Sequence, residues 1–141
     1  MKSAGCIVCL FVGALLCAPL TTAQALQVIG VSGPTVIAFF PPVTEKDLLQ
    51  DPDTNESLSD FQFYAQRVRT KLHDAGIDFQ EIYAAAFIVK CGAKTRNFHP
   101  QKAEVGYYFI APGKSPHIEY GVMTDADILQ IAKEYFHPTP R

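Results

Sequence analysis

The sequence predicts a single α/β domain, in which a central mixed β-sheet of four to five strands carries flanking helices, after a cleaved N-terminal signal peptide. Three observations lead to this prediction. The apolar run at residues 35–40 has the β-branched and aromatic composition of a buried strand. The segment 60–75 has the apolar stripe of a helix and connects this run to a second apolar run at 79–89. A hairpin and a closing helix at 125–136 complete the domain.

The first 25 residues have the pattern of a secretory signal peptide. Lys2 supplies a positive charge, an apolar run covers residues 7–16, and Ala23 and Ala25 are small residues before a predicted cleavage at Leu26. The apolar run is too short for a membrane-spanning helix, which needs about 20 residues. We therefore expect a periplasmic or secreted mature chain, residues 26–141, with no membrane span after cleavage.

Cleavage would remove three of the four cysteines and leave Cys91 as the only thiol; the three are Cys6, Cys9 and Cys17. A single thiol excludes an intrachain disulfide and a Cys-x-x-Cys redox pair in the mature protein. The full chain has 12 Lys and Arg against 14 Asp and Glu, a formal net charge of −2. This balance gives no reason to expect nucleic acid as a partner.

The first elements of the mature chain are predicted strands. Residues 28–31 form a weak strand that Ser32-Gly33-Pro34 ends, and residues 35–40 are apolar on both faces. Pro41-Pro42 ends the second strand, because proline has no N–H to donate to a sheet. Residues 41–59 then form a polar acidic insertion, which we expect to be a surface loop with one or two helical turns at 45–50.

The strongest predicted helix covers residues 60–75. Its apolar side chains share one face, and they are Phe61, Tyr64, Ala65, Val68, Leu72 and Ala75. Gly76 suits the left-handed conformation that ends a helix. Three basic residues lie off the apolar stripe and are predicted to face water; they are Arg67, Arg69 and Lys71. Residues 79–89 are expected to form one long buried strand.

The last part of the chain predicts a short strand at 95–98, a hairpin and a helix. The hairpin strands are 105–110 and 117–122, and Pro112-Gly113 suits the middle of a type II turn between them. Thr124 is the predicted cap of the helix at 125–136, and Asp125 lies at its positive end.

The order of strand, helix, strand, hairpin and helix resembles that of a thioredoxin-like domain. The most similar segment is 107–136, where Tyr107-Tyr108-Phe109-Ile110, the Pro112-Gly113-Lys114 turn, Ile118-Glu119-Tyr120-Gly121 and the closing helix are similar to the last third of a thioredoxin. The resemblance implies a thioredoxin-like fold, in which a right-handed crossover makes the first two strands of this pattern parallel.

The residues that carry thioredoxin chemistry are missing from the matching positions. After the strand that corresponds to 36–40 the family has Cys-x-x-Cys, and this chain has Pro41-Pro42-Val43-Thr44. Immediately before the hairpin strand the family has a cis-proline, and this chain has Ala103-Glu104-Val105-Gly106. Dithiol exchange needs an attacking and a resolving thiol. The resemblance therefore implies a redox-inactive member.

Cys91 is the first candidate for chemistry. Lys90 and Lys94 are near it in sequence, and nearby positive charge favours a thiolate. One alternative is therefore a monothiol redox enzyme that uses Cys91. A lone thiol outside the cytoplasm also permits a disulfide-linked dimer through Cys91. The more ordinary interpretation is a cysteine at the end of a strand with no catalytic duty.

A second alternative is a periplasmic metal carrier. His99 and His117 could meet across neighbouring strands with Cys91 nearby, and this soft ligand set suits copper or zinc. Scattered surface histidines explain the same pattern without a metal. We expect no cofactor.

The sequence thus favours binding over catalysis. We predict that the domain binds an extracytoplasmic protein or peptide, through an edge of its sheet or through the segment 41–59, where a long polar loop follows the central strand.

Overall fold

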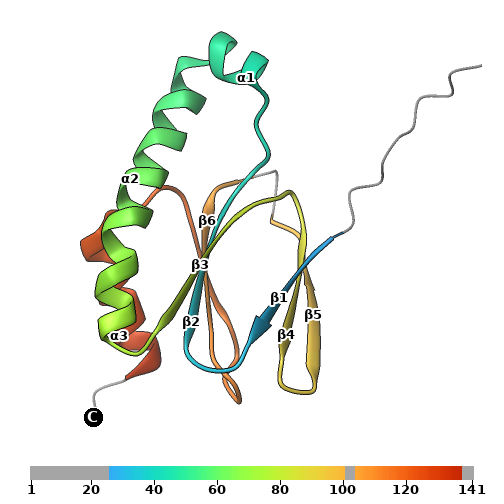
Figure 1. The fold of residues 1–141 in the computed structure, drawn as a ribbon, viewed down its shortest axis with the longest axis vertical. Coiled ribbons are helices and arrows are strands. Elements are labelled where there is room, and N and C mark those ends of the chain that lie inside the picture. Colours follow the sequence, from blue (N-terminus) through green and yellow to red (C-terminus); the bar gives the residue numbers. More distant parts are fainter. Residues whose placement is uncertain (1–25, 101–103, 138–141) are drawn as a thin grey trace, which may run out of the picture.

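The computed structural model describes residues 26–100 and 104–137, which form an α/β fold of seven strands and three helices (Figure 1). The strands are β1 (Gln27–Val31), β2 (Thr35–Phe40), β3 (Asp78–Tyr83), β4 (Phe87–Cys91), β5 (Lys94–Phe98), β6 (Gly106–Ile110) and β7 (His117–Tyr120). The helices are α1 (Glu45–Gln50), α2 (Pro52–Asp74) and α3 (Asp125–Phe136). The predicted signal peptide, with Cys6, Cys9 and Cys17, lies outside the described residues.

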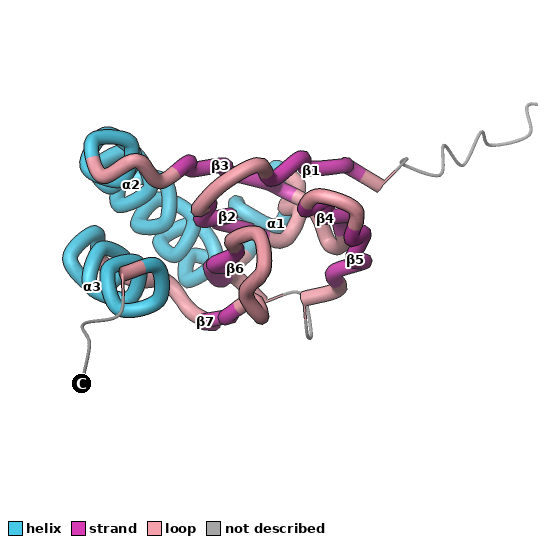
Figure 2. Tube along the Cα trace, turned by 90° about the horizontal axis from the view of Figure 1, so that it is seen from below, coloured by secondary structure: helices cyan, strands magenta, loops and turns pink. Residues whose placement is uncertain are grey.

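The elements form three layers, seen from below in Figure 2. Helices α2 and α3 cover one face of a four-stranded sheet of order β3-β2-β6-β7, and a three-stranded sheet of order β1-β4-β5 covers its other face. Both sheets are mixed. The α/β class is therefore confirmed. The prediction of one central sheet is wrong, because the strands divide between two.

In the four-stranded sheet, β2 pairs in parallel with β3, in a register that runs from Thr35 opposite Asp78 to Phe40 opposite Tyr83. Helix α2 makes the connection between these two strands. On its other side β2 pairs antiparallel with β6, and β6 with β7. Strand β2 is thus a central strand, as its composition predicts.

Two hydrophobic cores lie on the two faces of β2. Val36, Ala38 and Phe40 belong to the core under the helices, together with Phe61 and other residues of α2 and α3. Ile37 and Phe39 belong to the core between the two sheets. All six residues of β2 are buried, because successive side chains of a strand point to opposite faces and both faces are covered.

The predicted strand at 79–89 is two strands that belong to different sheets. The N–H of Ala84 donates to the carbonyl of Phe40 at 3.1 Å, beside the last rung between β3 and β2. The chain then bends at Ala85, and β4 pairs in parallel with β1 in the other sheet. Apolar composition predicts that both halves are buried, but it does not distinguish one sheet from two. The three consecutive alanines mark the bend.

The predicted acidic loop at 41–59 is largely helical. Thr44 and Asp47 form a capping box at the start of α1, in which each side chain accepts a hydrogen bond from the backbone N–H of the other residue. The carboxylate of Asp51 caps α2, and Pro52 occupies its first turn. Helix α2 therefore begins eight residues before the predicted start at 60, because Asp51-Pro52-Asp53 forms a helix start.

Other local predictions are confirmed. The strand at 35–40 and the helix at 125–136 have the predicted bounds. The hydroxyl of Thr124 accepts from the N–H of Asp127 at 3.2 Å, as expected for the helix cap. Gly76 and Gly113 have φ angles of 74° and 80°, in the left-handed region that their predicted roles require. No helix in the described part of the chain is long and apolar enough to cross a membrane.

The three basic residues of α2 were predicted only to face water, but they also form ion pairs. The Nζ of Lys71 lies 2.6 Å and the Nε of Arg67 lies 3.5 Å from oxygens of Asp125 in α3. Arg69 lies 2.9 Å from a carboxylate oxygen of Glu81 in β3. The basic side chains are about half exposed, but they connect α2 to both of its neighbours.

Candidate functional site

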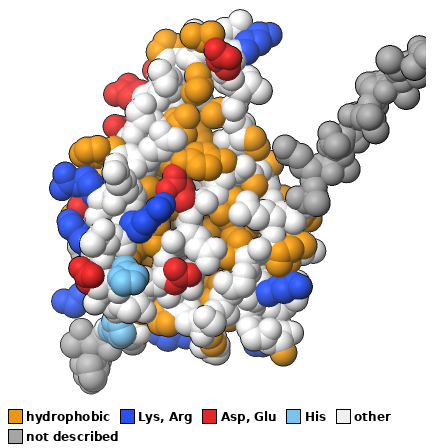
Figure 3. Space-filling view, in the orientation of Figure 1, with side chains coloured by type: hydrophobic (Ala, Val, Ile, Leu, Met, Phe, Trp, Pro, Cys, Tyr) orange, Lys and Arg blue, Asp and Glu red, His pale blue; other side chains and the backbone are white. Residues whose placement is uncertain are grey.

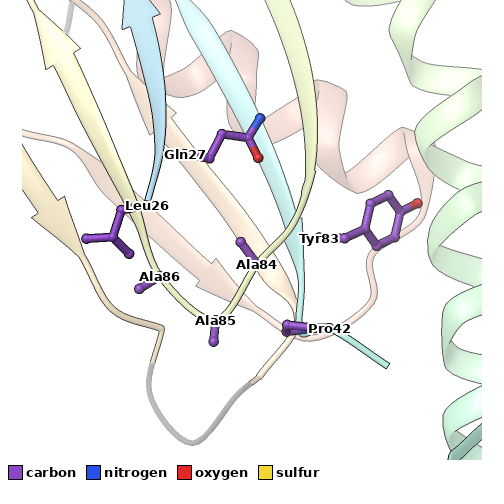
Figure 4. Close-up of a pocket in the computed structure, with 7 residues that line it drawn as sticks. All are labelled: Leu26, Gln27, Pro42, Tyr83, Ala84, Ala85 and Ala86. Atoms are coloured by element: carbon purple, nitrogen blue, oxygen red, sulfur yellow. The ribbon is translucent and has the colours of Figure 1, made fainter. Parts of the chain in front are cut away.

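A cleft of about 420 Å³ opens at the end of the molecule where the parallel strands β2 and β3 finish. Figure 4 shows its lining residues: Leu26, Gln27, Pro42, Tyr83, Ala84, Ala85 and Ala86. They come from the start of β1, the segment after β2, the end of β3 and the bend before β4. Ligands of open α/β sheets bind outside the carboxyl ends of parallel strands. This position makes the cleft the candidate functional site.

The surface around the cleft is apolar and accessible. Leu26 and Tyr83 in its lining are 44% and 43% exposed, and Val28 in the neighbouring β1 is 49% exposed. These are three of the six large hydrophobic side chains that are exposed within the described residues. Figure 3 shows hydrophobic side chains gathered below α1 and over the middle of this face. Exposed apolar groups beside a concavity are typical of a binding surface.

A row of polar side chains joins the end of β3 to α2. The hydroxyl of Tyr83 donates to Glu81, and the Nε2 of Gln62 donates to the Tyr83 hydroxyl at 3.3 Å. Arg69 donates to the other carboxylate oxygen of Glu81 at 2.9 Å. Burial of the ring raises the pKa of Tyr83 to about 12, and the hydrogen bond to Glu81 contributes to this rise. Tyr83 therefore stays protonated near neutral pH and acts as a hydrogen-bonding group.

Cys91 lies away from the cleft. It is the last residue of β4, whereas the cleft borders the residues just before this strand. Its side chain packs against the core between the two sheets, on the same strand as the buried Phe87 and Val89. Cys91 is partly buried and forms no disulfide within the described residues. This environment is that of a cysteine at the end of an inward-facing stripe.

The structure does not assemble the candidate metal ligands into one site. Cys91 pairs with Lys94 and Phe87 pairs with Phe98, so His99 and Cys91 lie at opposite ends of the β4–β5 hairpin, about 16 Å apart along the strands. His117 is in the other sheet, with its Nε2 at 2.7 Å from Glu119 and its ring stacked on Tyr135. No three His, Cys, Asp or Glu side chains within residues 26–100 and 104–137 form a group that could hold a metal.

The segment 41–59, predicted as a docking loop, projects beyond the ends of the strands as α1 and the start of α2 (Figure 1). Two of its acidic residues have local roles. Hydrogen bonds from Thr44 lower the pKa of Asp47, and hydrogen bonds from Thr54 lower that of Asp51. These carboxylates stabilise helix starts. Leu49 of α1 is 79% exposed.

Two smaller cavities lie elsewhere. One of about 240 Å³ lies between α2 and α3, beside Leu72 and Leu129. The other, about 340 Å³, lies between β7 and α3, where His117, Glu119 and Tyr135 already contact one another. Neither is at the carboxyl ends of parallel strands, so the cleft beside Tyr83 is the stronger candidate.

Sequence reasoning missed the cleft because none of its lining residues is charged. The predicted strand at 79–89 has the bend at 84–86 in its middle. The signal that could have located it is the Ala84-Ala85-Ala86 sequence, since three small residues interrupt two runs of large side chains. The pairing of residue 26 with this bend depends on β1 lying beside β4, which no local pattern predicts.

Comparisons with protein-family models, with curated proteins and with solved structures find no match to this chain.

Proposed function

We propose that this chain is an exported, redox-inactive domain of thioredoxin-like architecture, periplasmic or secreted, that binds a segment of another protein at the cleft beside Tyr83. The role is recognition, without catalysis by the domain itself. The binding surface extends from Leu26 to the bend at 84–86, and Cys91 takes no part in binding.

The order of elements supports the thioredoxin-like part of this proposal. The crossover β2–α2–β3, the hairpin β6–β7 and α3 follow in the order that the resemblance implies, and β2 and β3 are parallel. Helices α2 and α3 lie on the same face of the sheet (Figure 2). The resemblance does not account for the sheet β1-β4-β5, which covers the other face.

The chemistry of the cleft supports binding. Its lining consists of Leu, Gln, Pro, Tyr and Ala side chains, so it contains no thiol, imidazole, carboxylate or amine. Apolar walls with a few fixed hydrogen-bonding groups give affinity and orientation to a bound chain. Tyr83 borders the cleft, and its hydroxyl, which points toward α2 in Figure 4, is held by Glu81 and Gln62. This lining is the observation that carries the proposed function.

A peptide selection tests the proposal. Random peptides of about ten residues, the length of a long strand, are displayed on phage and selected against the purified protein. Ala85→Trp places a large side chain at the exposed bend that borders the cleft. Ala93→Trp is the matched control, because Ala93 is also exposed but lies in the turn after β4, at the other end of that strand.

We expect a selected peptide to bind the wild type and the Ala93→Trp control equally, and to lose binding to Ala85→Trp. Unchanged urea unfolding midpoints would show that both variants are folded. Peptides that bind Ala85→Trp as well as wild type, or a selection that enriches no peptide, would contradict the proposal.

A further inference from the structure

Four strands lie at the edges of the two sheets, and one of them differs from the rest in charge. Edge strands present unpaired backbone groups, and proteins commonly protect them with charged side chains. Three of the four edges carry such residues; they are Asp78 and Glu81 in β3, Lys94 and Arg96 in β5, and His117 and Glu119 in β7. The fourth edge, β1, has the sequence Gln-Val-Ile-Gly-Val and no charged residue.

The unprotected edge is accessible. Within the described residues β1 pairs with β4 alone. Ile29 and Val31 point into the core between the sheets, while Val28 and Gly30 are exposed. A Cβ atom built on Gly30 meets no atom within 4 Å, so the outer face of the strand is open at this position. Because no described strand pairs with β1 on the side away from β4, a further extended chain can pair with it there.

We infer that β1 is the edge to which an extended, uncharged segment of a partner protein adds as a fourth strand of the β1-β4-β5 sheet. This inference rests on the proposed function and names the mode of binding. Strand addition takes affinity from backbone hydrogen bonds and specificity from pockets for alternate side chains. The cleft supplies such a pocket, because Leu26 and Gln27 at the start of β1 form part of its wall.

The partner segment must match the surface that it covers. Apolar side chains at alternate positions would pack on the exposed Val28, and a side chain beyond the start of β1 would enter the cleft. A charged segment would lose its hydration without gaining an ion pair, since β1 offers none.

A second copy of this chain fits the edge less well. If β1 paired with another β1 antiparallel about Ile29, Val31 of the second copy would lie opposite Gln27. The Ser32-Gly33-Pro34 turn would follow beside Leu26, and it has no large side chain to fill the cleft. A longer partner segment can continue past this point.

Two lysine variants separate strand addition from binding in the cleft alone. Val28→Lys places a charge on the exposed face of β1, and Asn97→Lys places one on β5, the opposite edge of the same sheet. The probe is the most enriched peptide of the selection, synthesised with blocked ends. Its affinity is measured for both variants and for Ala85→Trp, and amide hydrogen exchange is recorded with and without the peptide.

We expect Val28→Lys to weaken binding by about tenfold or more, since an apolar contact is lost and the added strand would take the lysine charge partly out of water. Asn97→Lys should bind like the wild type, and β1 amides should gain protection. Binding that Ala85→Trp abolishes and Val28→Lys leaves intact would overturn strand addition while the proposed function stands. Protection along another edge, or a wild-type protein that dimerises through β1 and ignores the peptide, would overturn it too.

Discussion

Asp125 in the first turn of α3 shows how a single side chain can have two structural roles. It lies at the positive end of its helix, as the sequence predicts, and it is only 8% exposed. The hydrogen bond from Lys71 lowers the pKa of Asp125 below its ordinary value of 3.8, and the charge of Arg67 adds to this effect. The carboxylate therefore connects α3 to α2.

Asp125→Asn should lower the stability of the protein at neutral pH, because the folded state loses an ion pair. The contribution of a carboxylate with a lowered pKa is present above 3.8 and is lost as the pH falls toward the folded-state value. The difference in free energy of unfolding between wild type and variant should therefore shrink in acid. Urea titrations at several pH values would measure it.

Asp60→Asn is the control, because Asp60 is exposed and makes no ion pair or side-chain hydrogen bond within the described residues. Its effect should be small at every pH. A difference between wild type and Asp125→Asn that stayed constant from neutral pH into acid would contradict the assigned ion pairs.

Cys91→Ala should leave peptide binding unchanged and cost about 1 kcal/mol of stability, typical of a modest packing loss. The thiol packs against the core between the sheets, away from the cleft. Affinity measurements and urea unfolding of the variant would check both statements. Loss of peptide binding in the variant would show that Cys91 belongs to the binding site.

A non-reducing gel of the wild type tests the disulfide-linked dimer through Cys91.

At the scale of elements, the sequence predicts best where local pattern and environment agree. Residues 35–40 are apolar throughout, and the strand they form is covered on both faces. The helix at 125–136 has a threonine cap and an apolar face, and both are found. The prediction fails at 79–89, where a similar apolar run contains a bend. Hydrophobic periodicity cannot show that the chain leaves one sheet for another.

Gly106 marks a close approach between β6 and its neighbours. A Cβ atom at this position would lie 2.7 Å from the Phe39 ring and against the backbone oxygen of Glu119 in β7. Gly106→Ala should therefore destabilise the protein by about 2 kcal/mol or more, as overpacking does. Gly30→Ala in β1 is the matched control, since nothing lies within 4 Å of its Cβ position. Equal urea midpoints for the two variants would contradict the packing described for β6.

At the scale of the whole molecule, the sequence predicts the class of the fold but not the site. The order of elements follows from local patterns, whereas the cleft forms only when β1 pairs with β4 and brings Leu26 beside Ala86. The candidate catalytic and metal-binding residues in the sequence do not indicate the cleft. Cys91, His99 and His117 lie outside the cleft, and its lining consists of uncharged residues that no catalytic or metal motif contains.

Export should leave a mature chain that begins at Leu26, next to the cleft. Expression of residues 1–141 without an N-terminal tag, followed by mass spectrometry of the exported protein, would identify the cleavage site. Ala25→Lys should block processing, because the signal peptidase requires a small residue there. A protein that keeps residues 1–25 after export, or that stays inside the cell, would contradict the prediction.

The most direct test of binding at the cleft and β1 is to map where a selected peptide contacts the protein. Amide chemical shifts of the isotope-labelled wild type would be recorded as the peptide is added. Strand addition at β1 predicts that the largest changes fall on residues 27–30 of β1 and on residues 84–86 of the cleft. Changes confined to the cavity between α2 and α3, or to that between β7 and α3, would contradict it.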